Sequence, residues 1–146
     1  MRTVLPDHGS GWQDVLEPAA YWQAGPWSVR LAGVRSACPA LELYEADVLL
    51  DVVSATRIAP QSLRGARSFA CAAGRYALAW GRLPGPGTDL VVEFSRGLRR
   101  HVLAAEAVPI TAWCWLAVAD GHFRRVDVRA GGEGVRRSLA GGRPCR

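Results

Sequence analysis

Residues 110–130, ITAWCWLAVADGHFRRVDVRA, carry most of the information about the fold. The segment 109–119 is apolar on both faces of an extended chain, as a central strand requires, and 122–130 alternates between apolar and charged residues. Between them stands Asp120-Gly121, a pair that favours a type I′ turn because both positions tolerate a positive φ. The stretch therefore predicts a hairpin of two antiparallel strands.

A two-residue turn would also set the register of this hairpin, with Trp115 opposite Val126 and Trp113 opposite Val128. Both indoles would then have apolar neighbours, whereas a surface that stacks nucleobases sets its aromatic rings among basic residues. Burying two such rings is worth roughly 7–12 kcal/mol of gross transfer free energy at about 25 cal/mol per Å². We therefore expect both tryptophans in the core and not on a ligand platform.

Similar patterns flank this stretch. Alternating segments at 75–83, 89–95, 98–106 and 135–140 are separated by glycine-containing turns and predict further short strands. Residues 40–53, ALELYEADVLLDVV, fit a helix by the spacing of their apolar residues and a strand by their β-branched composition, and the strand is slightly favoured.

These patterns predict a mainly β protein, built as an antiparallel β-sandwich or small barrel. An irregular, aromatic-rich N-terminal arm is expected over 1–28 and should pack onto the body. One short helix fits within that arm, over 12–23, although Pro18 interrupts it. A single β-rich domain is expected over 29–140, followed by a loose tail over 141–146.

The charge of the chain is positive and unevenly distributed. All eighteen basic residues are arginine, and the formal net charge is +5. Residues 1–51 hold three arginines and seven acidic residues, a balance of −4, whereas residues 52–146 hold fifteen arginines and six acidic residues, a balance of +9. The basic later part allows an acidic or nucleic-acid partner, although the absence of lysine indicates a general bias toward arginine.

The chain carries no motif for a cofactor, a metal ion or a known type of catalysis, so a catalytic role is not favoured. Its four cysteines lack the paired spacing of zinc or redox sites. The acidic residues Glu42, Glu45, Asp47 and Asp51 are expected to form a solvated edge and not a cation site. With no export signal and no apolar run long enough to span a membrane, we expect a cytoplasmic protein with reduced cysteines.

The predicted register points to one candidate surface, a basic sheet face. Arg125 and Arg129 would share this face with Asp127, and the strand at 98–106 could add to it if it lies alongside. The candidate binding residues are Arg99, His101, Arg125, Arg129 and Arg136. Such arginines can hold phosphates or carboxylates, but the simpler interpretation, that they only solubilise the sheet and pair with nearby acids, is favoured.

The leading functional hypothesis is a non-catalytic β-rich binding or assembly module. It would engage a protein partner or its own copy through the basic sheet face or an exposed strand edge. One alternative is a small-molecule-binding barrel, or a barrel enzyme of specialised metabolism, with a cavity lined by Tyr76, Trp80, Trp113 and Trp115. Another is nucleic-acid binding through the arginine face.

Overall fold

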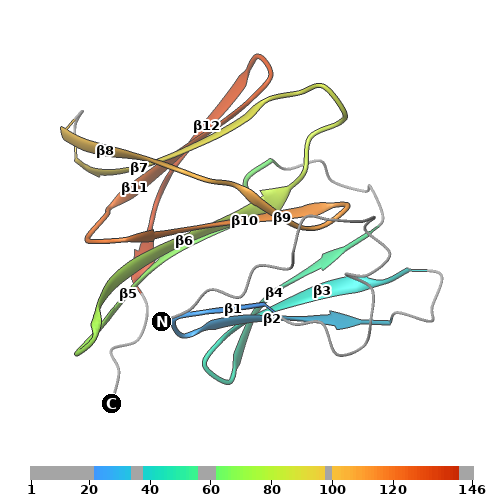
Figure 1. The fold of residues 1–146 in the computed structure, drawn as a ribbon, viewed down its shortest axis with the longest axis horizontal. Coiled ribbons are helices and arrows are strands. Elements are labelled where there is room, and N and C mark those ends of the chain that lie inside the picture. Colours follow the sequence, from blue (N-terminus) through green and yellow to red (C-terminus); the bar gives the residue numbers. More distant parts are fainter. Residues whose placement is uncertain (1–21, 34–37, 56–61, 98–99, 142–146) are drawn as a thin grey trace. The chain divides into compact units, whose positions relative to one another are not determined.

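The chain consists of β-strands and their connections throughout the part that the structure describes (Figure 1). The computed structural model describes residues 22–33, 38–55, 62–97 and 100–141. No helix in these ranges is long and apolar enough to cross a membrane. The predicted mainly β fold with antiparallel sheets is confirmed.

The chain divides into two compact units, residues 1–59 with 110–114 and residues 60–109 with 115–146. In the first unit one antiparallel sheet has the order β1-β2-β3-β4. Its strands are β1 (Trp22–Ala24), β2 (Trp27–Ala32), β3 (Ala40–Glu45) and β4 (Val48–Ser54). The irregular arm predicted for 1–28 lies mostly outside the described residues, and its last part forms β1 and the start of β2.

Residues 40–53 form the hairpin of β3 and β4, so the helix alternative is wrong. Ala46 turns the chain with a φ of 51°, and its N–H donates to the carbonyl of Pro26 at 2.7 Å. In the adjacent core the indole N–H of fully buried Trp27 donates to the Glu45 carboxylate at 3.1 Å. Strand alternation along β3 buries every second residue, which a helix with the same sequence would not do.

The remaining strands form two sheets. One has the order β13-β5-β6-β10-β9 and the other β12-β11-β7-β8. The first comprises β5 (Gly65–Cys71), β6 (Gly74–Arg82), β9 (Val108–Thr111), β10 (Cys114–Asp120) and β13 (Ala140–Gly141). The second comprises β7 (Leu90–Gly97), β8 (Arg100–Ala105), β11 (Arg125–Ala130) and β12 (Glu133–Ser138).

Within the second unit the two sheets bury their facing sides in a common core, as a β-sandwich does. The five-stranded sheet contributes small residues from β6 and from β10 around one large ring, that of Trp115. The four-stranded sheet contributes branched and aromatic residues. The core members from β6, β10, β7 and β11 are Ala77, Ala79, Trp115, Ala117, Ala119, Val92, Phe94, Val126 and Val128.

The hairpin predicted at Asp120-Gly121 is wrong, because β10 and β11 belong to different sheets (Figure 1). β10 is buried on both faces and has β6 and β9 as its neighbours, so no edge is left for β11. Residues 121–124 instead carry the chain across the sandwich. Phe123 anchors this connection: it is buried and packs on Phe94 with ring centroids 5.7 Å apart.

The two tryptophans of the opening stretch have different positions. The predicted strand over 109–119 is broken at Ala112 and Trp113, which form the turn between β9 and β10. Trp115 is fully buried, as expected, and donates its indole N–H to the Ser62 carbonyl at 2.9 Å. Trp113 is half-buried and donates to the Val53 carbonyl at 3.0 Å, within the first unit. The expected burial in the core is thus confirmed for Trp115 and only partial for Trp113.

Candidate binding surfaces

The outer face of the four-stranded sheet holds the predicted basic residues of β11. Arg125, Asp127 and Arg129 alternate with Val126 and Val128, which are fully buried. The predicted direction of these side chains is therefore correct, although the predicted strand partner is not. The alternation follows from the two-residue period of an extended chain, and this holds in whichever sheet the strand lies.

Neighbouring strands neutralise most of this charge. Asp127 lies opposite Arg136 of β12 and opposite Glu93 of β7. The Arg136 Nε lies 2.8 Å from the Asp127 Oδ1, and the Arg129 Nη2 lies 2.9 Å from the Glu93 Oε1. Two arginines and two carboxylates thus cancel, and Arg125 alone adds net charge among these five residues. The face is better described as ion-paired than as basic.

His101, another predicted binding residue, is not part of this group. His101 is exposed and lies in β8, which is separated from β11 by β7. Its φ of 53° marks an irregular start of that strand. Arg99 lies outside the described residues. The structure therefore brings Arg125, Arg129 and Arg136 together on one face and places His101 two strands away.

One ion pair on this face gives a direct prediction. Replacing Arg136 with alanine should lower the free energy of unfolding by less than about 1 kcal/mol, because the pair with Asp127 is largely solvated. Chemical denaturation of the variant and of the matched Arg125→Ala protein would measure the difference. A loss above roughly 2 kcal/mol, beyond what exposed pairs contribute, would contradict the description of a solvated pair.

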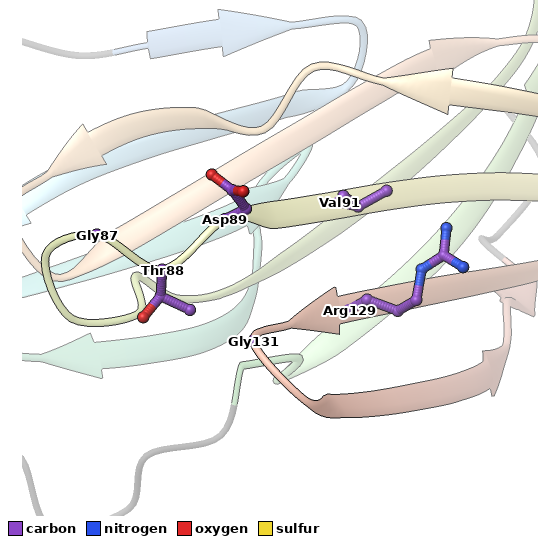
Figure 2. A pocket seen from close by; sticks show the side chains of 6 residues that line it. All are labelled: Gly87, Thr88, Asp89, Val91, Arg129 and Gly131. Carbon is purple, nitrogen blue, oxygen red and sulfur yellow. The ribbon is translucent and has the colours of Figure 1, made fainter.

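An open depression of about 430 Å³ lies at one end of the same sheet (Figure 2). The loop before β7 and the turn between β11 and β12 form its walls, where the Gly131 N–H donates to the Asp89 carbonyl at 3.4 Å. Its lining residues are Gly87, Thr88, Asp89, Val91, Arg129 and Gly131. The Arg129 guanidinium is already paired with Glu93, and the remaining charge in the lining is the Asp89 carboxylate. This lining does not include the aromatic residues predicted to shape a ligand cavity.

The acidic residues near the first sheet have partners of their own. The Glu42 carboxylate accepts a hydrogen bond from the Tyr44 hydroxyl at 2.8 Å, which raises the pKa of that phenol together with partial desolvation. Glu45 is buried against the Trp27 indole, and the Asp51 carboxylate accepts from the Val52 N–H at 2.8 Å. Across the residues that the structure describes, no group of three potential metal ligands occurs.

The edge strand β8 exposes apolar side chains on both of its faces. Val102 is 54% exposed and Leu103 is 43% exposed. Among the described strands, β8 pairs with β7 alone, where Val102 lies opposite Ser95 and Leu103 opposite Phe94. Its outer backbone N–H and C=O groups therefore form a free edge.

Two other edge strands carry charges along their length or in their middle, whereas the charged residue of β8 is its first, Arg100. The edge strand β12 is exposed along its whole length and carries Glu133, Arg136 and Arg137, which discourage strand addition. β4 also exposes valine and leucine side chains but has Asp51 in its middle. Within β8, the segment 102–105 carries no charge. The sequence predicted an exposed strand edge only in general terms, and the sheet order shows that β8 is one such edge.

Comparisons with known proteins found no matching family model, no similar curated protein and no similar solved structure. The surfaces described above are therefore the basis for assigning a function.

Proposed function

We propose that this protein is a non-catalytic assembly module in which the free edge of β8 pairs with the same edge of a second copy. The observation that carries this proposal is the exposed, uncharged segment 102–105 on an edge strand. An unprotected strand edge is a template for main-chain hydrogen bonds with another strand. Natural monomers usually block such an edge with a charge, a proline or a bulge.

The side chains of β8 suit antiparallel pairing with a copy. A twofold axis at Leu103 would set Val102 opposite Ala104 of the second copy and His101 opposite Ala105. These pairs are apolar or neutral and place no like charges together, which would oppose association. Two four-stranded sheets would join into one, and each copy would contribute the same patch, as twofold interfaces require.

The other functional hypotheses stay predictions. Nucleic-acid binding through Arg125, Arg129 and Arg136 has weak support, because two of these arginines are already ion-paired. A small-molecule site among Tyr76, Trp80, Trp113 and Trp115 has less support, because Trp80 and Trp115 are buried and Trp115 packs in the sandwich core. The cytoplasmic location also stays a prediction.

A charge introduced on the edge tests the assembly proposal. Val102→Lys should abolish self-association, because a lysine on an edge strand has to be desolvated when another strand is added. The measurement is molar mass by light scattering across a concentration series. The matched control is Val135→Lys on β12, the opposite edge of the same sheet, where the native valine is 38% exposed.

The wild-type protein and Val135→Lys should both show a mass above that of one chain that increases with concentration, whereas Val102→Lys should stay monomeric. Hydrogen exchange should show protection of the β8 amides in the wild-type protein that increases with its concentration. A monomeric wild-type protein with concentration-independent exchange in β8, or equal loss of association in both lysine variants, would overturn the proposal. If the purified protein stayed monomeric and its β8 edge paired with a different protein instead, a second copy would not be the partner.

A further inference from the structure

The connection between β10 and β11 lies beside the backbones of two other arginine-bearing strands and carries an arginine of its own. The Gly121 N–H donates to the Arg75 carbonyl at 2.8 Å, which ties the connection to the start of β6. The Arg124 N–H donates to the Ser95 carbonyl at 2.9 Å, which ties it to the end of β7 beside Arg96. All these segments lie at one end of the second unit, on the left in Figure 1.

The polar side chains of this connection face solvent because its aromatic residue faces inward. Phe123 is 6% exposed and packs against Phe94, whereas His122 and Arg124 on either side are exposed. Arg75 and Arg96 are exposed as well. A Cβ placed on Gly121 would lie 3.9 Å from the Arg96 Nη2, so that guanidinium lies directly over the backbone of the connection.

The three guanidinium groups act on the same imidazole. Partial desolvation lowers the pKa of His122, and the charges of Arg75, Arg124 and Arg96 lower it further. Among the described residues, no ion pair neutralises any of these three arginines. Asp120 is the acidic residue next to the connection and makes no ion pair with them. The cluster thus differs from the outer sheet face, where carboxylates balance Arg129 and Arg136.

We infer that Arg75, Arg96, His122 and Arg124 form a binding site for a phosphate group. Three guanidinium groups near one imidazole, with no ion pair among the described residues, repel each other, and a doubly charged oxyanion reduces that repulsion. Guanidinium is suited to phosphate because its N–H groups form paired, charge-assisted hydrogen bonds with two oxygens. A neutral His122 can donate one further hydrogen bond and can gain a proton when the dianion is bound. This site goes beyond the proposed assembly through β8 and does not depend on it.

Titration of pyrophosphate into the isotopically labelled full chain, followed by NMR, tests the site. Binding should move the amide resonances of residues 121–124 and raise the pKa of the His122 imidazole. Arg96→Gln should weaken binding by about tenfold or more, since it removes the charge-assisted hydrogen bonds of one guanidinium group. Arg124→Gln, whose backbone contact to β7 is retained, should do the same. The matched control is Arg125→Gln, which removes a neighbouring, half-buried arginine outside the cluster.

A short single-stranded oligonucleotide forms the second arm of the experiment. Binding of pyrophosphate but not of the oligonucleotide would assign the site to a small phosphorylated ligand. Binding of both, with equal sensitivity to Arg96→Gln, would assign it to a polynucleotide backbone. If pyrophosphate leaves residues 121–124 unchanged, or if Arg96→Gln and Arg125→Gln weaken binding equally, the cluster is only a solvated cationic end and the inference fails. Molar mass from light scattering reports only on self-association. It therefore distinguishes failure of this inference from failure of the β8 assembly.

Discussion

Gly81→Ala should destabilise the protein by about 3 kcal/mol or more, because a side chain at this position has no space. A Cβ on Gly81 would overlap the backbone carbonyl of Ser62 and lie 2.9 Å from the Trp115 Nε1. That carbonyl accepts the indole hydrogen bond, and the Arg64 N–H donates to the Trp80 carbonyl at 2.8 Å, which holds the 62–64 segment against β6. The backbone therefore cannot move away without breaking these bonds.

Urea denaturation of the purified variant would measure this loss as a lower midpoint with an unchanged slope. Gly85→Ala is the matched control, because nothing lies within 4 Å of a Cβ at that position. The control should differ from the wild-type protein by less than about 0.5 kcal/mol. Equal stability of the two variants would show that the 62–64 segment does not pack closely on β6.

Trp115→Ala should destabilise the protein by about 3–5 kcal/mol, because removing a fully buried ring leaves a cavity. The ring belongs to the core of the sandwich, together with Val126 and Val128. Trp115→Phe fills most of that space but removes the indole N–H, which leaves the Ser62 carbonyl without this donor. We expect a loss of about 1–3 kcal/mol for the phenylalanine variant.

Trp113→Ala provides the comparison within the same short stretch. Trp113 is half-buried, so its replacement removes less apolar surface from the core and should have a smaller effect than Trp115→Ala. Thermal and urea unfolding of all three variants would give the order. If Trp113→Ala were as damaging as Trp115→Ala, Trp115 would not be the main aromatic anchor of this stretch.

The strands of this protein could be predicted where their pattern is local. Alternation in 89–95 and 122–130 indicated which side chains are buried, and Val92, Phe94, Val126 and Val128 lie in the core. Which strands pair with each other could not be predicted in the same way. Asp120-Gly121 favours a tight hairpin in isolation, but Phe123 packs on Phe94 of the opposite sheet, and the chain crosses over there.

For the candidate surfaces too, the direction of side chains could be predicted from the local pattern, but their neighbours could not. The outward direction of Arg125 and Arg129 followed from the period of the strand, but the ion pair of Arg129 with Glu93 depends on the pairing of β7 with β11. The cluster of Arg75, Arg96 and Arg124 was not predicted. These residues are distant in the sequence, and only the backbone bonds at both ends of the 121–124 connection bring them together.

The sequence by itself determined that this chain forms short strands with one apolar face, since an extended backbone sends successive side chains to opposite sides. It also predicted that Trp113 and Trp115 would be buried, since leaving so large a ring in water is costly, and this is fully true of Trp115 only. Only the tertiary structure decided which strands pair, that β8 ends the order of its sheet among the described strands, and that Arg75, Arg96 and Arg124 lie near His122. Those features depend on contacts between distant segments, and the free energy of such contacts is absent from any local pattern.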